Sequence, residues 1–438
     1  MHYEDKYISV EQALSFVKSG DVIVSGLGPC EAGLFMGQLH TVAERVRNVT
    51  VINCLPTHPS QIYQSEYADT FDVDGWFYAP VLRKAHGQGN LAYIPNHLHQ
   101  TATKWLSNRK PNIYVGAATL PDKYCYVSLS LSNTYERRMI DAADLVILEV
   151  NPNMPYTLGD LHVHVSEVDY LIRADYKPPV RADLPFTEKD AAIGKLIAQM
   201  VPDGSCIQLG IGGIPNAVAK ALENKNDLGV HTEMLTSGMV KLAKMGVING
   251  KYKQIERGKM VASFALGTQE LYDYLDYNPS VAIMDGAWVN DPYVISCNDN
   301  HVSINTTLEV DLTGQCASES IGSCQYSGTG GQSVTAIGAQ NSRNGKSIIA
   351  LYSTVMVKDP VTGEQKEVSK IVPQLTPGAA VSLSRNDVDR VVTEYGVAEL
   401  RGTNLRERVA RLIAIAHPKF REELWEQAVA VGILGKRR

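Results

Sequence analysis

Two stretches of the sequence, "SVEQALSFVKSGDVIVSGLG" (9–28) and "TEKDAAIGKLIAQMVPDGSCIQLGIGG" (187–213), follow the same plan. Each opens with a helix-capping pattern, Ser9 with Gln12 and Thr187 with an acidic first turn. Apolar residues at helical spacing follow each cap: Val10, Ala13, Leu14 and Val17, then Ile193, Leu196, Ile197 and Met200. Each predicted helix ends at a turn of Gly and Asp, which leads into a short apolar strand that stops at glycines. The repeat predicts two related structural units.

Strands that run through glycines into a helix are typical of parallel sheets covered by helices. The chain is therefore predicted to be an α/β protein with two related domains. The stretch "RADYKPPVRADLPF" (173–186) combines prolines with mixed charges, which indicates a linker. We expect an N-terminal α/β domain over residues 1–180 and a C-terminal α/β domain over residues 187–438.

A second pair of stretches supports the duplication. "AADLVILEVN" (142–151) and "DVDRVVTEYG" (387–396) each contain an acidic turn, a strand and then a glutamate with a turn residue. The glutamates, Glu149 and Glu394, stand at matching points in both copies, which favours a shared structural role over a catalytic one.

Glu233 lies in a strand-like stretch that has a counterpart in the first half of the chain. The stretches "NVTVINCL" (48–55) and "DLGVHTEML" (227–235) both read as the strand that follows the glycine turn. The first copy ends on Asn53 and Cys54, and only the second ends on a carboxylate. Ligands of open α/β sheets bind at the carboxyl ends of strands. Glu233 is thus a candidate catalytic residue, with a structural ion pair as the alternative.

The composition favours a small-molecule partner. The 438 residues carry a formal charge of −6, with 41 Lys and Arg scattered among 47 Asp and Glu, so no basic patch suggests nucleic acid or an anionic membrane. The N-terminus, "MHYEDKYISVEQ", lacks an apolar signal core, and no apolar run approaches the roughly 18 residues of a spanning helix. We therefore expect a cytoplasmic protein.

The cysteines and histidines do not indicate a disulfide framework or a metal site. The seven cysteines are spread along the chain without a C-x-x-C pair, as suits a reducing compartment. The pairs His97/His99 and His162/His164 lack further ligands at metal-binding spacing, so we predict no metal.

The segment "GIGGIP" (210–215) partly matches the dinucleotide-binding fingerprint. Glu233 follows about 20 residues later, where that fold places the acid that binds the ribose. However, Pro215 occupies the position of the third glycine. A glycine loop that opens a helix suits any phosphate-bearing ligand, so coenzyme A fits as well as NAD.

A second glycine cluster, "QYSGTGGQ" (325–332), contains the pair Gly330–Gly331. Consecutive glycines let backbone N–H groups approach a ligand carbonyl closely, as an oxyanion hole requires. An ordinary turn is the alternative.

Several long motifs resemble one known family. They are "QLGIGGIPNAV", "LGVHTEMLTSGMV", "YSGTGGQ", "SKIVPQLTPGAAVSLSRNDVDRVVTEYGVAELRG", "LRERVARLIAIAHPKF" and, in the first half, "GDLHVHVSEVD". Together they resemble the acetyl-CoA hydrolase/transferase family, most closely its branch of 4-hydroxybutyrate and butyryl-CoA:acetate CoA-transferases. The resemblance implies two doubly wound α/β domains of the class I CoA-transferase type, a homo-oligomer, and coenzyme A or acetyl-CoA as a substrate with no permanently bound cofactor.

The resemblance also implies roles for individual residues. Glu233, in the C-terminal domain, matches the nucleophile that becomes a glutamyl-CoA thioester, and Gly330 with Gly331 would supply oxyanion donors. The positions that match CoA contacts are Gly210, Ile211, Gly212, Gly213, Ile214, Leu308 and Gly331. The family places one more contact near residues 353–358, without a clear match here. Glu319, close to the glycine cluster, stays open as a substrate-orienting acid or a rival nucleophile.

The implied activity is transfer of CoA between a short acyl-CoA and a short-chain carboxylic acid such as butyrate or 4-hydroxybutyrate, by a ping-pong mechanism. Acetyl-CoA hydrolysis and a transferase for succinate or itaconate stay open as alternatives. An NAD-dependent enzyme and a non-catalytic acyl-CoA sensor are the hypotheses from other classes.

Overall fold

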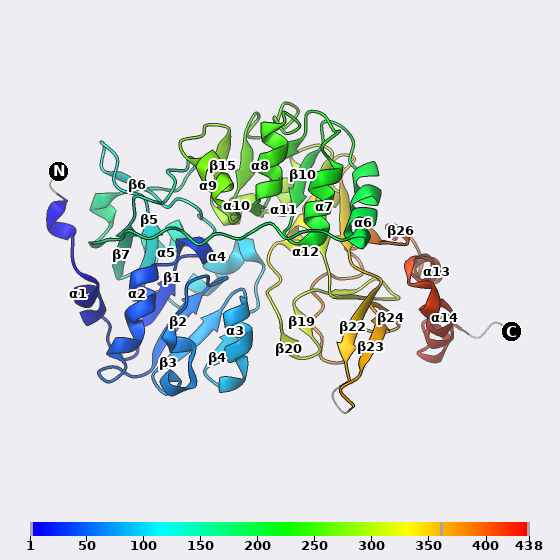
Figure 1. Ribbon diagram of the computed structural model, residues 1–438, viewed down its shortest axis with the longest axis horizontal. Helices are drawn as coiled ribbons and strands as arrows, with labels where there is room; N and C mark the ends of the chain where they lie inside the picture. Colours follow the sequence, from blue (N-terminus) through cyan, green and yellow to red (C-terminus); the bar gives the residue numbers. More distant parts are fainter. Residues whose placement is uncertain (1–2, 360–361, 436–438) are drawn as a thin grey trace. The chain divides into compact units, whose positions relative to one another are not determined.

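The computed structural model describes residues 3–359 and 362–435, which form two compact units. The first unit comprises residues 1–182, 232–237 and 259–290, and the second comprises residues 183–231, 238–258 and 291–438. Each unit contains its own parallel sheet with helices packed against it (Figure 1). The α/β fold class with mainly parallel sheets is therefore confirmed.

The first unit is built on a seven-stranded sheet with the order β4-β3-β2-β1-β5-β7-β9. All of its strand pairs are parallel. The chain starts at the central β1 and winds first to one edge and then to the other, so the sheet is doubly wound. The strands are β1 (Val22–Ser25), β2 (Val49–Asn53), β3 (Phe71–Gly75), β4 (Leu91–Tyr93), β5 (Ile113–Ala118), β7 (Leu145–Val150) and β9 (Tyr170–Arg173).

The second unit is built on a six-stranded sheet with the order β11-β10-β16-β21-β25-β26, in which only the last pair is antiparallel. Its strands are β10 (Cys206–Leu209), β11 (Gly229–Val230), β16 (His301–Thr306), β21 (Lys346–Ala350), β25 (Arg390–Thr393) and β26 (Gly396–Glu399). Small sheets in this unit are formed by β17 (Glu309–Asp311), β18 (Cys316–Ala317) and β24 (Ile371–Val372), by β19 (Ser320–Ile321) and β20 (Cys324–Gln325), and by β22 (Thr354–Lys358) and β23 (Gln365–Ser369).

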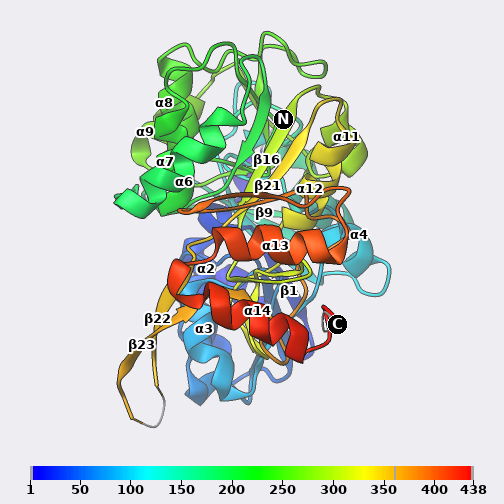
Figure 2. The same ribbon diagram turned by 90° about the vertical axis from the view of Figure 1, so that its right-hand side faces the viewer.

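Helices cover both sheets. Those of the first unit are α1 (Val10–Ser15), α2 (Gly33–Gln38), α3 (Pro80–Ala85), α4 (Thr101–Leu106), α5 (Glu136–Ala142), α9 (Gln269–Leu275) and α10 (Gly286–Val289). Those of the second are α6 (Glu188–Gln199), α7 (Gly213–Ala221), α8 (Ser237–Lys244, whose first residue belongs to the first unit), α11 (Pro292–Ser296), α12 (Gln332–Asn341), α13 (Leu405–Ile415) and α14 (Arg421–Ala430). Figure 2 shows α13 and α14 packed side by side.

The two expected capping boxes are present. The Ser9 hydroxyl accepts from the Gln12 N–H at the start of α1, and the Thr187 hydroxyl accepts from the Asp190 N–H at the start of α6. The apolar stripes face buried cores, because Ala13, Val17 and their neighbours are buried in the first unit, as are Ile193 and Ile197 in the second. Gly194 lets α6 approach α7 closely, since a Cβ there would lie 2.8 Å from the Ala217 backbone.

The compact units differ from the expected continuous C-terminal domain over residues 187–438. The segments 232–237 and 259–290 belong to the first unit, and Glu233 is part of it. The reason is backbone pairing: Ala265 N–H donates to the Leu131 carbonyl and Asn133 N–H donates to the Ser263 carbonyl. Hydrogen bonds between segments that are distant in the chain therefore decide which unit residues 232–237 and 259–290 belong to.

Four short strands form small parallel pairs in these segments: β12 (Met234–Leu235) pairs with β14 (Phe264–Ala265), and β13 (Met260–Ala262) pairs with β15 (Val281–Ile283). A further hairpin joins β6 (Tyr126–Ser128) to β8 (His162–His164).

Two details of the predicted duplication were wrong. The stretch 227–235 is interrupted, because β11 ends at Val230 and β12 begins at Met234. The stretches 142–151 and 387–396 form β7 and β25, yet β7 is the second strand from β1 whereas β25 is the third from β10. Similar local patterns thus occupy different places in the two sheets.

Candidate active site

Glu233 lies in the break between β11 and β12, and its backbone is firmly held. Its carbonyl accepts hydrogen bonds from the N–H groups of Ser263 (3.0 Å) and Phe264 (3.1 Å), and from the Ser263 hydroxyl (2.9 Å). The preceding Thr232 N–H donates to the Val261 carbonyl. These hydrogen bonds fix the backbone from which the Glu233 side chain extends.

The Glu233 carboxylate is oriented by Asn290. The Asn290 side-chain amide donates to Oε2 of Glu233 at 2.7 Å, and Asn290 itself is only 1% exposed. Asn290 follows α10, 57 residues beyond Glu233 in the chain, and no local pattern points to it, so sequence reasoning missed it. A half-buried carboxylate with one oxygen held by a rigid donor keeps its other oxygen in a defined direction.

Buried carboxylates and a thiol line the same edge of the first unit. Burial, and then the charges of Glu136, Glu233 and Glu31, raise the pKa of the Cys54 thiol well above its usual range. Cys54 directly follows β2, so the strand ends that the sequence comparison paired lie within electrostatic reach of each other. Burial also raises the pKa of Glu31 to about 7, because the carboxylate is taken out of water.

The structural reading of Glu149 and Glu394 agrees with their contacts. Glu149 accepts from the N–H groups of Leu34 (3.1 Å) and Phe35 (2.7 Å) at the start of α2, and burial raises its pKa to about 7. Glu394 accepts from the N–H (2.9 Å) and hydroxyl (2.7 Å) of Ser353. Each carboxylate ties a strand end to a neighbouring backbone segment, which is a positioning role.

The predicted CoA loop, Gly210 to Ile214, joins β10 to α7 in the second unit. Gly212 has a φ of 121°, which side chains other than hydrogen rarely allow. Gly213 lies directly over the Asp190 carboxylate, since a Cβ there would be 2.9 Å from it. Asp190 in turn accepts a 2.7 Å hydrogen bond from the Tyr352 hydroxyl. Asp190 and Tyr352 thus pack beneath Gly213 on its buried side. Residues Gly210 to Gly213 stay half-exposed at the N-terminus of α7.

The pair Gly330–Gly331 leads into the N-terminus of α12. Gly330 has a φ of 55°, and both glycines are buried. Across the described residues, neither N–H group donates to a protein acceptor. Buried N–H groups without protein partners are suited to a ligand oxygen.

Glu319 shapes the glycine turn. Its carboxylate accepts from the hydroxyls of Thr329 (2.6 Å) and Ser382 (2.7 Å), and its carbonyl accepts from Tyr326 and Ser327 N–H. These contacts favour an orienting role over a nucleophilic one.

Leu308 lies just beyond β16, at the same carboxyl edge of the second sheet, with its N–H bonded to the Ala317 carbonyl. Residues 353–358, where a further CoA contact is expected, begin beyond β21 and run into β22. The structure therefore gathers the predicted CoA contacts in the second unit and Glu233 in the first.

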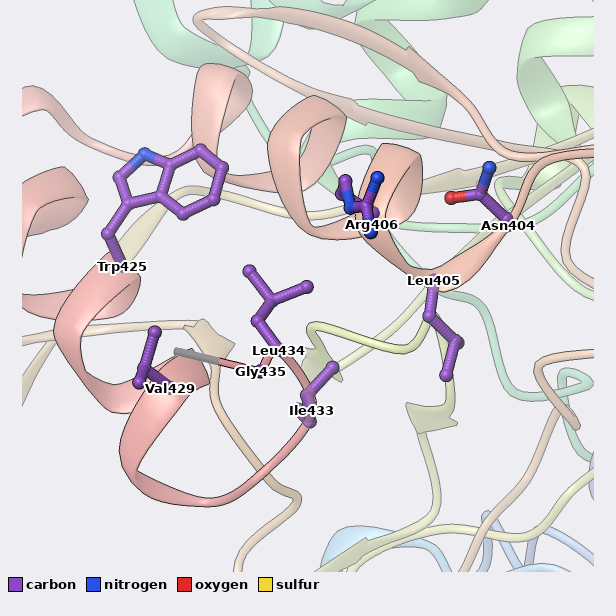
Figure 3. Close-up of a pocket in the computed structure, with 8 residues that line it drawn as sticks. All are labelled: Asn404, Leu405, Arg406, Trp425, Val429, Ile433, Leu434 and Gly435. Atoms are coloured by element: carbon purple, nitrogen blue, oxygen red, sulfur yellow. The ribbon is translucent and has the colours of Figure 1, made fainter. Parts of the chain in front are cut away.

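A large surface pocket lies elsewhere and involves none of the predicted site residues. It lies between the start of α13 and the end of α14 (Figure 3). Its lining residues are Asn404, Leu405, Arg406, Trp425, Val429, Ile433, Leu434 and Gly435. Among the described residues, this lining contains no carboxylate, thiol or hydroxyl that could act as a nucleophile in acyl transfer.

Metal ligands, cysteines and helix hydrophobicity bear on the class of protein. Residues 3–359 and 362–435 contain no group of three or more His, Cys, Asp or Glu placed to hold a metal. All seven cysteines are free thiols. Over the same residues, no helix has the length and apolar character needed to cross a membrane.

Comparison with known proteins identifies the family of the chain. The N-terminal domain of the acetyl-CoA hydrolase/transferase family matches residues 1–181, and its C-terminal domain matches residues 267–428. A succinyl-CoA:cyclohexane-1-carboxylate CoA transferase of Geobacter metallireducens is 43% identical over 427 residues, which cover 97% of this chain and 95% of that protein. A 4-hydroxybutyrate coenzyme A transferase of Clostridium kluyveri is 39% identical over 97% of both chains.

The fold is shared with a solved structure. The crystal structure of RipA from Yersinia pestis superposes with a TM-score of 0.90 at 32% identity, over 99% of both chains. Acetyl-CoA hydrolases of Candida albicans and Yarrowia lipolytica are more distant, at 30% and 27% identity over 55% and 59% of this chain. The protein is thus an enzyme of the CoA-transferase class. The chain belongs to the acetyl-CoA hydrolase/transferase family, as its motifs predicted.

Proposed function

We propose that this enzyme moves CoA between an acyl-CoA and a carboxylic acid by a ping-pong mechanism in which Glu233 is the nucleophile. The observation that carries the proposal is the way Glu233 is held: its carbonyl is fixed by Ser263 and Phe264, and its carboxylate by Asn290. A carboxylate oxygen can attack without giving up a proton first, so this nucleophile needs no general base, unlike a serine hydroxyl.

The chemistry proceeds in two balanced halves. In the first, a Glu233 oxygen attacks the acyl-CoA carbonyl and expels CoA thiolate, which leaves an acyl-glutamyl anhydride. The thiolate then attacks the glutamyl carbonyl, so that a glutamyl-CoA thioester forms and the first carboxylate leaves. In the second half, another carboxylate attacks the thioester and the same steps run in reverse. The incoming acid departs as its CoA ester and Glu233 is restored.

Each tetrahedral intermediate places negative charge on oxygen. We propose that the N–H groups of Gly330 and Gly331 stabilise this charge, with a typical contribution of about 3 kcal/mol per donor. The loop from Gly210 to Ile214, together with Leu308, would bind coenzyme A, which is a substrate here and not a resident cofactor. The half-exposed loop at the α7 N-terminus suits its phosphates.

For the carboxylic acids, we propose short-chain substrates such as acetate with butyrate or 4-hydroxybutyrate. The 4-hydroxybutyrate enzyme of Clostridium kluyveri supports this choice. The Geobacter metallireducens relative acts, by its name, on succinyl-CoA and cyclohexane-1-carboxylate, which makes succinyl-CoA with a cyclic acid the second candidate. Acetyl-CoA hydrolysis differs only in the acceptor, and the hydrolases are the more distant relatives. We also propose a cytoplasmic homo-oligomer.

Trapping of the thioester tests the proposal. The protein is incubated with acetyl-CoA, treated with borohydride or hydroxylamine, and the peptide containing residues 229–239 is analysed by mass spectrometry. Modification at Glu233, absent from Glu233→Gln and present in Glu364→Gln, an exposed control, is expected. An enzyme that turns over while this peptide stays unmodified would rule out Glu233 as the nucleophile.

Turnover with and without an added acid separates transfer from hydrolysis. We expect acetyl-CoA to be consumed only when butyrate, 4-hydroxybutyrate or another acid is present. Equal consumption in its absence would identify a hydrolase.

A further inference from the structure

Lys370 projects from a fixed point at the carboxyl edge of the second sheet. It lies between β23 and β24, and its backbone is bonded on both sides. Its N–H donates to the Ser353 carbonyl (2.9 Å), and its carbonyl accepts from the Val310 N–H (3.0 Å). Ser353 lies shortly after the end of β21. The hydrogen bond to Ser353 therefore holds the Lys370 backbone close to the end of this strand.

The Lys370 ammonium is half-buried and poorly satisfied. Among the residues that the structure describes, its one hydrogen bond goes to the Thr307 carbonyl at 3.5 Å, and its Nζ lies 5.7 Å from the centre of the Tyr352 ring. Within residues 3–359 and 362–435, no carboxylate lies within 4 Å of it. An ammonium group has three donors, and a charge removed from water without strong partners is costly.

The two carboxylates whose charges act on Lys370 are bonded to other groups. Glu394 accepts from Ser353 and forms an ion pair with Lys189 at 3.6 Å. Glu309 accepts from the N–H (2.8 Å) and hydroxyl (2.9 Å) of Thr376. Both act on Lys370 only at longer range, and burial lowers its pKa to about 8 against their opposing effect.

The groups around Lys370 connect it to the predicted CoA contacts. Thr307, its hydrogen-bond acceptor, directly precedes Leu308. Tyr352, whose ring faces the ammonium, donates to Asp190, and Asp190 supports Gly213 in the glycine loop. Resting on the proposed function, we propose that Lys370 binds a phosphate group of coenzyme A. A compact ammonium with unused donors is suited to a phosphate oxygen, which would restore the stabilisation lost by burial.

The proposal has a pH signature. Burial lowers the Lys370 pKa to about 8, so the ammonium form predominates below pH 8 and is lost as the pH rises through this value. The charges that act on it are those of Glu394 and Glu309, and the titratable Tyr352 ring faces it. Burial raises the pKa of the Tyr352 hydroxyl well above this range. CoA affinity of the wild type is therefore expected to fall above pH 8, whereas Lys370→Arg, with an always charged guanidinium, keeps its affinity.

Isothermal titration of the full chain with CoA, dephospho-CoA and pantetheine provides the test. Lys370→Gln is expected to weaken CoA binding roughly 10- to 100-fold and to leave pantetheine binding unchanged. The matched control is Lys366→Gln, at an exposed lysine on β23 just before Lys370. This variant is expected to bind CoA as the wild type does. If the loss persists with dephospho-CoA, the diphosphate is the partner, and if it disappears, the 3′-phosphate is.

An equal loss for CoA and pantetheine, or no loss for either, would overturn the inference, because Lys370 would then be structural. The ratio of the two affinities is measured on one variant and so does not depend on its stability, and the pH profile of Lys370→Arg gives a second readout if Lys370→Gln folds poorly. A wild-type chain that binds no CoA would instead refute the proposed function, and this inference with it.

Discussion

The glycine turns that follow β1 and β10 come from the same sequence plan but differ in what fills them. In the first unit, the Glu136 carboxylate accepts the Leu27 N–H at 2.9 Å, and the whole turn is buried. In the second unit, the turn from Gly210 to Gly213 is half-exposed at the start of α7. An internal carboxylate thus stands in the first turn where the second leaves space for an external anion. The first turn is therefore filled by the protein itself, and the second is open to solvent.

The largest difference between the matched stretches 48–55 and 227–235 is the carboxylate of Glu233, which only the second stretch carries. Glu233→Gln keeps the size and a hydrogen-bond acceptor for Asn290 but removes the proposed nucleophile, so kcat is expected to fall about ten-thousand-fold. The measurement is CoA transfer at saturating substrate. Retention of more than about one-tenth of the activity would remove the catalytic distinction between the copies.

Alanine at equivalent glycines tests the difference between the filled and open turns. A Cβ on Gly26 would lie 2.2 Å from the Cys30 carbonyl oxygen, whereas a Cβ on Gly210 meets nothing closer than 4.0 Å. Gly26→Ala is expected to lower the free energy of unfolding by about 3 to 5 kcal/mol, and Gly210→Ala by less than about 1 kcal/mol. Urea denaturation gives both values. Equal effects would mean that the two turns are packed alike.

The buried carboxylates at the edge of the first sheet predict a pH-dependent stability. The Glu149 pKa is raised to about 7, so the folded protein holds a proton that the unfolded chain releases above pH 4.5. Its contribution therefore favours folding at pH 4.5 and is lost progressively up to pH 7, by about 3 kcal/mol in total. Glu149→Gln should flatten this part of the profile. If the free energy of unfolding of Glu149→Gln changes with pH between 5 and 7 as that of the wild type does, Glu149 does not bind a proton in the folded state over this range.

The smallest expected effect concerns the support beneath the open turn. Tyr352→Phe removes the 2.7 Å hydrogen bond to Asp190 without changing the ring that faces Lys370. Stability should fall by about 1 kcal/mol and KM for acetyl-CoA should rise a few-fold at constant kcat. A fall in kcat at constant KM would instead mean that Tyr352 takes part in the reaction and does not only support the loop.

Local patterns predicted a large part of the architecture. The capping boxes at Ser9 and Thr187, the apolar stripes and the glycine ends of β1 and β10 depend on neighbours within a few residues, and these were read correctly. The repeat of this plan, together with the family motifs, was sufficient for two parallel sheets and the family. The similarity between residues 142–151 and 387–396 predicted matching strands wrongly, because similar local patterns do not define the position of a strand in its sheet.

The sequence by itself determined the helix starts, the strand and turn chemistry, and Glu233 as the unmatched acid. Only the tertiary structure decided that Glu233 packs with the first unit, that Asn290 orients it, that Glu136 fills the first glycine turn, and that Lys370 faces the edge of the second sheet. The physical reason is distance along the chain. Caps and turns are set by residues three or four apart, whereas these contacts join segments tens to hundreds of residues apart, and those meet only when the sheets have formed.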